Sequence, residues 1–248
     1  MAKLADDAEP PPPGLKSLYR VGGITVLIAV LVALAEIAIG FQPEVARASQ
    51  RTVTVIDWFT LFQSNWFLGL RNLGLLNLMG AFLLTPTFLA MHFALRRENE
   101  PLPALGAILF FMGMAVYIAS NRGFAMLSLS SQHANAATDA QRSVLVAAGQ
   151  TMLVEGTNRV GLVLIDLAGV VISAVMVRGK VFGKAAACAG ILGNGLMIVF
   201  EAVQALAPTR LNTWLIIAIC AGISIMAWWV LVGLRLLRLG DALNKAAR

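Results

Sequence analysis

The sequence contains six apolar runs, each long enough to cross a lipid bilayer as a helix. A membrane-spanning helix takes about 20 predominantly apolar residues. Only 13% of the 248 residues are charged, whereas a soluble domain has about 25%, so little polar side chain is left to cover a water-facing surface. We therefore expect an all-α polytopic membrane protein, a bundle of about six transmembrane helices, at approximately 21–41, 67–95, 102–127, 150–177, 183–206 and 212–236.

The chain outside these runs is short. Residues 1–18 carry three acidic residues and four consecutive prolines, a composition typical of a disordered, solvated tail. We expect the transmembrane domain to occupy 19–240 and a second tail to occupy 241–248.

The first apolar run has some features of a cleaved signal peptide, because Ala46-Arg47-Ala48 resembles a signal-peptidase site. The run is nevertheless about 20 residues long and contains Glu36, whereas the apolar region of a signal peptide is shorter. We expect it to be retained as the first transmembrane helix.

Basic residues predict the orientation of the bundle. Twelve Lys and Arg residues lie in the turns at 95–101 and 178–184 and in the terminal segments up to position 20 and from position 235 onward, and four lie in the alternate connections at 42–66, 128–149 and 207–211. Short cytoplasmic segments carry an excess of Lys and Arg. We therefore expect a multi-pass protein of the inner (plasma) membrane with both termini in the cytoplasm. The same placement explains the net charge of +6 by contact with lipid headgroups, without a nucleic-acid partner.

Two of the outer connections are too long to be simple turns. In 42–66, the aromatic and aliphatic side chains predict a segment lying in the outer membrane interface; they are Ile56, Trp58, Phe59, Phe62 and Trp66. In 128–149, the sequence Thr138-Asp139-Ala140-Gln141 matches a capping box that starts a helix. A helix from there to Val177 would be about 60 Å long, so it must project from the bilayer or bend near Gly149 or Gly156.

Seven charged residues remain inside the apolar runs once the residues of the tails and turns are set aside. Each costs about 2.5–3.5 kcal/mol at the centre of a membrane, so they must pair or reach water. With the orientation above, all except Asp166 fall in the outer half of the bilayer, and Asp166 falls near its middle. The seven are Glu36, Arg71, Arg122, Glu155, Arg159, Asp166 and Glu201.

Helical geometry brings these charges together. At 100° per residue, Glu155, Arg159 and Asp166 share one face of the fourth run, and Asn194 and Glu201 share one face of the fifth. We predict a polar ligand-binding pocket that opens outward and is lined from the first five runs. Its shell is completed by Asn72, Tyr117, Asn121 and Asn158. The alternative is that buried Arg–Glu pairs only fix helix registry, and that some charges extend to the interface.

The sequence argues against a metal or cofactor site. His92 and His133 are the only histidines and are predicted on opposite sides of the bilayer, so they cannot share a metal ion. Phosphate-binding loops and serine nucleophile elbows do not occur. Cys188 and Cys220 lie within apolar runs, where cysteine usually serves as a small packing residue.

Six short stretches of the sequence carry a family resemblance: WFLGL at 66–70, ALRREN at 94–99, AVYIASNR at 115–122, AATDAQR at 136–142, AAGQ at 147–150 and VFG at 181–183. They resemble a bacterial membrane family, the one catalogued as domain of unknown function 4386. The resemblance covers most of the chain from the first to the fifth run and is most specific between positions 66 and 150. It implies a multi-helix bacterial membrane protein, and it implies no activity, cofactor or catalytic residue.

Three functional hypotheses follow. The first is a non-enzymatic, transporter-like or sensory protein that binds a small polar or amphiphilic ligand in the outer-half pocket. The second is a structural or assembly subunit of a homo-oligomer or membrane complex, with Trp228 and Trp229 facing lipid or a partner. The third is a lipid-modifying enzyme that uses Glu155, Asp166 and Glu201 as acids or bases, which the lack of a nucleophile or metal motif disfavours.

Overall fold

The computed structural model describes residues 14–51, 53–154, 158–206 and 211–246, and all regular secondary structure in these ranges is helical. Six of the described segments are long and apolar enough to cross a membrane, so the chain is a multi-pass membrane protein. The predicted tail lies mostly outside the described residues, although residues from Leu15 onward are already helical. The spanning helices are α1 (Leu15–Gly40), α5 (Leu75–Leu95), α6 (Pro101–Ala119, whose span continues into α7), α9 (Asn158–Arg178), α10 (Lys184–Leu206) and α11 (Leu211–Ala246).

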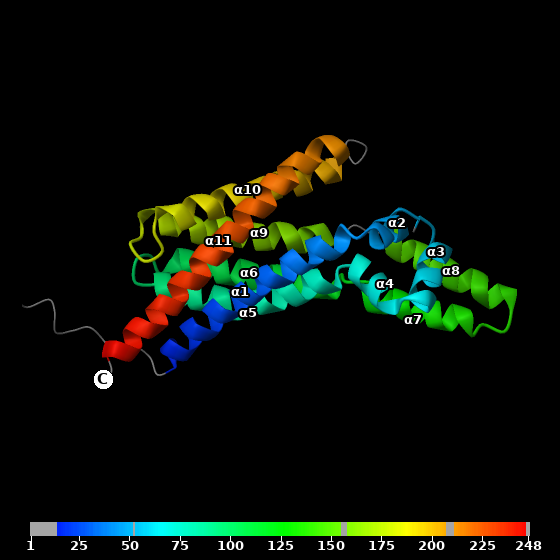
Figure 1. Cartoon of the computed structure of the whole chain (residues 1–248), viewed down its shortest axis with the longest axis horizontal. Helices are drawn as coiled ribbons and strands as arrows, with labels where there is room; N and C mark the ends of the chain where they lie inside the picture. Colours follow the sequence, from blue (N-terminus) through cyan, green and yellow to red (C-terminus); the bar gives the residue numbers. More distant parts are fainter. Residues whose placement is uncertain (1–13, 52, 155–157, 207–210, 247–248) are drawn as a thin grey trace, which may run out of the picture.

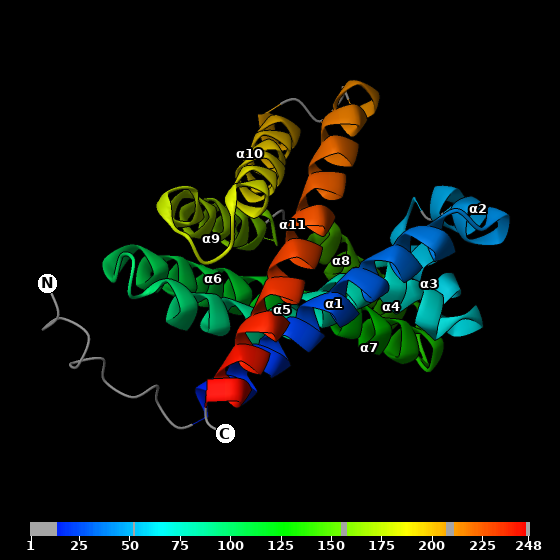
Figure 2. The same ribbon diagram turned by 60° about the vertical axis from the view of Figure 1, so that its left-hand side comes forward.

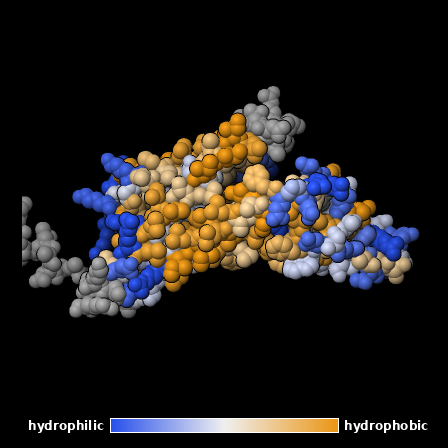
Figure 3. Space-filling model, viewed as in Figure 1, coloured by the Kyte–Doolittle hydropathy of each residue, from blue (hydrophilic) through white to orange (hydrophobic). Residues whose placement is uncertain are grey.

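The six spanning helices form a ring in chain order: each packs against the next, and α11 packs against α1 (Figures 1 and 2). The start of α1 and the end of α11 lie at the same end of the ring, where Arg20 and Asp241 form an ion pair of 2.7 Å. We call this the terminal end. An apolar surface separates the hydrophilic terminal end from the mixed surface at the opposite end (Figure 3), as expected of a protein that crosses a bilayer.

Glycines allow the helices of the ring to approach closely. A Cβ atom on Gly22 of α1 would lie 3.0 Å from a backbone oxygen of α5, and one on Gly193 of α10 would lie 2.7 Å from a backbone nitrogen of α11. Gly113 and Gly161 face each other where α6 crosses α9, each with backbone atoms of the other helix within 3 Å of its missing Cβ. Small residues at crossings are the usual means of association inside a membrane, where apolar lipid removes the hydrophobic drive between helices.

Aromatic side chains fill the interior of the ring. Phe88 of α5 stacks on Phe110 of α6 with ring centroids 3.9 Å apart, and Trp228 of α11 meets Phe88 edge-on at 6.2 Å. The prediction that Trp228 faces lipid or a partner is therefore wrong, because its side chain is only 1% exposed. The indole fits because Gly190 opposite it has no side chain: a Cβ there would lie 2.7 Å from the indole nitrogen. We call Phe88, Phe110 and Trp228 the aromatic plug.

At the other end of the ring, four shorter helices form a second cluster, the helical cap: α3 (Val55–Ser64), α4 (Trp66–Asn72), α7 (Gly123–Ala134) and α8 (Asp139–Val154). Helix α2 (Pro43–Arg51) connects α1 to it. The cap has its own buried core of Val55, Phe59, Phe62, Leu70 and Met126. Phe59 and Phe62, which we expected in the membrane interface, are buried here instead, whereas Ile56 and Trp66 are exposed.

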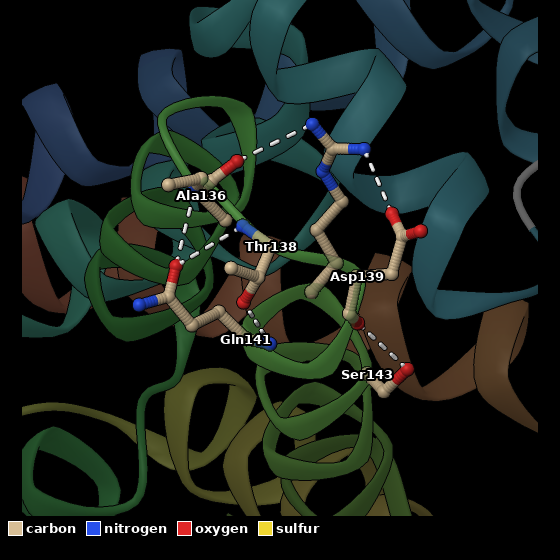
Figure 4. A network of polar contacts seen from close by, with 7 residues as sticks. Ala136, Thr138, Asp139, Gln141 and Ser143 are labelled. Atoms are coloured by element: carbon tan, nitrogen blue, oxygen red, sulfur yellow. Dashed lines mark hydrogen bonds and ion pairs between the residues drawn. The ribbon is translucent and has the colours of Figure 1, made fainter.

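The predicted capping box at the start of α8 is confirmed (Figure 4). The backbone N–H of Gln141 donates to the hydroxyl of Thr138 at 3.3 Å, and the amide oxygen of Gln141 accepts from the backbone N–H of Thr138 at 3.3 Å. Gly149 lies inside α8, which is helical from Asp139 to Val154. This glycine serves close packing, because a Cβ would lie 2.6 Å from Val55 of α3. The alternative bend, at Gly156, lies outside the described residues.

Thr138→Ala should destabilise the start of α8 by about 1 kcal/mol, the usual cost of losing an N-cap side chain. Hydrogen exchange of the amides in the first turn of α8 should become faster, while exchange in α9 stays the same. The matched control is Thr151→Ala in the same helix, because the Thr151 hydroxyl bonds only to the carbonyl of Ala147 one turn earlier. Equal exchange in the first turn of both variants would contradict a capping role.

Candidate functional site

The candidate site lies where two predicted spanning helices break. The predicted helix 67–95 is interrupted at Gly74, whose φ of +88° lies in the left-handed region that favours glycine. Arg71 and Asn72 therefore belong to α4 of the helical cap and not to the spanning helix α5.

The predicted helix 102–127 also breaks, because α6 ends at Ala119 and α7 begins at Gly123. The side-chain oxygen of Asn121 accepts from the backbone N–H of Gly123 at 3.1 Å, and its side-chain nitrogen donates to the carbonyl of Leu73 at 3.3 Å. Asn121 thus satisfies backbone groups in both breaks. Such local side-chain bonds compete with the helical pattern, and they place Asn121 and Arg122 in a non-helical connection.

A cavity of about 690 Å³ lies inside the ring, between the aromatic plug and the helical cap. Seven of the twelve predicted site residues line it: Glu36, Asn72, Tyr117, Asn121, Arg122, Asp166 and Glu201. Most of the remaining wall is apolar, including Ala29, Ala33, Leu84, Leu162, Ile165, Met197, Ile225 and Met226.

The sixth spanning helix also lines the cavity, although the prediction used only the first five. Gly222 and Trp229 belong to the wall that α11 contributes. The close approach of α11 to α1 explains this placement, because a Cβ on Gly23 of α1 would lie 2.9 Å from the carbonyl oxygen of Gly233. Helix α11 contributes no charged residue to the cavity, so the pattern of charges in the sequence could not indicate it.

The other five predicted residues have different positions. Arg71 lines a smaller adjoining hollow of about 340 Å³ that also contains Glu36 and Asn72. Asn194 is buried, but its side-chain nitrogen donates to the carbonyl of Gly190 in its own helix at 2.7 Å, and it does not line the cavity. Arg159 is the ion-pair partner of a cavity residue, as described below. The remaining two positions, Glu155 and the side chain of Asn158, lie outside the described part of the structure.

Two ion pairs connect neighbouring helices beside the cavity. Arg71 contacts the carboxylate of Glu36 at 2.9 Å, donates to the backbone oxygen of Glu36 at 2.9 Å, and donates to the Asn72 side chain at 2.9 Å. Arg159 of α9 contacts Glu201 of α10 at 3.2 Å. These four charges are therefore paired, as both the pocket hypothesis and the structural alternative allow.

The Arg122 guanidinium lines the cavity and donates to the backbone carbonyl of Met152 in α8. It thereby ties the break between α6 and α7 to the helical cap. Its position makes it the basic group at the cap-side end of the cavity.

Asp166 differs from the other charged residues. This residue is only 7% exposed, and it lines the cavity. It forms no hydrogen bond or ion pair with any residue that the structure describes. It lies eight residues after the start of α9, which corresponds to about 12 Å along the helix axis, so it is deeper in the ring than the ion pairs.

Within the described ranges, no three His, Cys, Asp or Glu residues gather as a metal ion would require. Comparison with known proteins finds no matching protein-family model, curated protein or solved structure. The resemblance to domain of unknown function 4386 therefore stays a prediction.

Proposed function

We propose that this protein binds a small amphiphilic ligand in the cavity of its helix ring and acts as a transporter-like or sensory membrane protein. The observation that carries the proposal is the cavity of about 690 Å³ that all six spanning helices line. Ligand pockets typically have volumes of about 300–1,000 Å³, with apolar walls and a few polar groups that fix orientation. This cavity has that composition, with polar groups toward the cap and apolar groups toward the plug.

The two ends of the cavity differ, and this difference supports ligand access from the cap side alone. The aromatic plug fills the ring on the terminal side of Leu84, which is one helical turn from Phe88 and lines the cavity. On the cap side, the polar residues of the two helix breaks line the cavity. The excess of Lys and Arg at the terminal end favours a cytoplasmic location for both termini, so the proposed ligand enters from outside the plasma membrane.

Filling the cavity should abolish binding without unfolding the protein. Gly80 and Gly222 line the cavity, and a Cβ at either position meets no atom within 4 Å. Gly80→Leu and Gly222→Leu should each weaken the binding of a bulky amphiphile at least tenfold in lipid nanodiscs. The probes are radiolabelled tetraphenylphosphonium and tetraphenylborate, two ions of similar size and opposite charge, with binding to empty nanodiscs subtracted.

Gly195→Leu is the matched control, because a Cβ on Gly195 also meets no atom within 4 Å, but this glycine does not line the cavity. All three variants should unfold no more readily than the native protein, since leucine favours a helix more than glycine does. If neither probe binds the native protein, or if the cavity variants bind like the Gly195→Leu control, the proposed function is wrong.

A further inference from the structure

We infer that the cavity is selective for an amphiphilic organic cation, such as a protonated amine or a quaternary ammonium compound, with Asp166 as its counter-ion. This inference rests on the proposed function and adds the chemical class of the ligand. The decisive observation is the side chain of Asp166, a residue only 7% exposed, which lines the cavity and has no partner among the described residues.

A buried carboxylate without a partner is expensive. Burying an ionised carboxylate costs several kcal/mol unless an opposite charge or hydrogen-bond donors compensate it. Arg71 contacts Glu36, and Arg159 contacts Glu201. The third arginine, Arg122, lines the cavity and donates to the backbone carbonyl of Met152. Glu201 carries a charge of the same sign as Asp166 and is itself paired with Arg159. A cation entering the cavity would supply the missing partner.

The charge balance of the apolar runs agrees with one bound positive charge. Apart from Lys184 and Arg235 at their ends, these runs hold four carboxylates and three guanidinium groups by sequence, so one negative charge is in excess. Glu36 and Glu201 are in ion pairs, whereas Asp166 is in none with the residues that the structure describes. A ligand carrying one positive charge would make the interior neutral.

The walls around Asp166 favour an organic cation over a metal ion. Calcium takes six to eight oxygen ligands and magnesium requires an octahedral set, whereas the residues lining this part of the cavity are mostly apolar, among them Leu162, Ile165, Met197 and Ile225. Aliphatic walls instead match the hydrocarbon part of an amphiphile. Trp229 also lines the cavity, and an indole ring is the side chain that attracts organic cations most strongly.

The test compares the two isosteric ions on the native protein and on Asp166→Asn. Native protein in nanodiscs should bind tetraphenylphosphonium at least tenfold more tightly than tetraphenylborate, after subtraction of empty nanodiscs. Asp166→Asn keeps the shape of the side chain and removes its charge, so it should weaken tetraphenylphosphonium binding at least tenfold and leave tetraphenylborate binding unweakened. The control is Asp241→Asn, whose exposed carboxylate pairs with Arg20 at the terminal end and should leave both affinities unchanged.

The outcomes separate this inference from the proposed function. Equal binding of the two ions, or tighter binding of tetraphenylborate, with loss of both in Gly222→Leu, would overturn the cation site and leave the ligand cavity in place. Binding that Gly222→Leu does not affect would overturn both. Because the comparison of the two ions needs only native protein, it decides the question even if Asp166→Asn does not fold.

Discussion

Replacing Glu36 with leucine will destabilise the protein by about 3–5 kcal/mol, the cost of removing one partner from a buried ion pair. The side chains of Arg71 and Glu36 are only 10% and 22% exposed. After the replacement, the Arg71 guanidinium stays buried and charged, because arginine cannot be deprotonated in a protein. Unfolding by increasing fractions of dodecyl sulfate in mixed micelles measures the change.

Replacing the other partner, in Arg71→Met, should lower the stability of the protein less than Glu36→Leu does. A carboxyl group that loses its counter-ion can take up a proton and become neutral, whereas a guanidinium group has no such escape. The double variant should be more stable than Glu36→Leu alone, since both charges are then absent. Such a cycle isolates the interaction between the two residues.

Asp241→Leu is the control for these variants. Asp241 forms an ion pair with Arg20, and the two side chains are 61% and 45% exposed, respectively. Exposed ion pairs contribute at most about 1 kcal/mol to stability. Equal and additive effects of Glu36→Leu and Arg71→Met would show that the buried pair does not hold α1 against the helical cap.

Gly161→Ala should destabilise the protein by about 1–3 kcal/mol, as expected for overpacking. A Cβ at this position would lie 2.8 Å from the backbone nitrogen of Tyr117 and 2.9 Å from the backbone oxygen of Gly113. Backbone atoms cannot rotate away as a side chain can, so α6 and α9 must separate. Gly161→Val should have a larger effect in the same mixed-micelle unfolding.

Gly195→Ala provides the matched control in α10. A Cβ there meets no atom within 4 Å, so the change should stabilise the protein by about 0.5–1 kcal/mol through the helix preference of alanine. If Gly161→Ala is as stable as Gly195→Ala, then α6 and α9 are not packed as closely as the structure has them.

The spanning helices were predictable because crossing a bilayer demands a minimum length of apolar sequence, and that demand is visible in a single chain. The breaks at Gly74 and after Ala119 were not predicted, because apolar residues continue on both sides of each break. Each break nevertheless has a local signal in the sequence. The first has Gly74 directly after Leu73, and the second has Asn121 two residues before Gly123; glycine and asparagine favour turns. The core of the helical cap was hidden for a different reason: Phe59 and Phe62 suit a membrane interface as well as a protein core.

The residues that line the cavity were predictable only in part. Topology alone placed charged residues of separate helices at one level, and seven of the twelve predicted residues line the cavity. Periodicity could not show that Asn194 bonds to its own helix, because that depends on its contact with Gly169 across the helix interface. Nor could a search for charges find the contribution of α11, whose wall residues are apolar.

A density map of the native protein in lipid nanodiscs with tetraphenylphosphonium tests most directly whether the cavity of the six-helix ring holds a ligand. We expect density for the probe between the aromatic plug and the helical cap, with its positive charge beside Asp166. A map in which side chains fill this space, or in which the probe binds only at the lipid-facing surface, would contradict it.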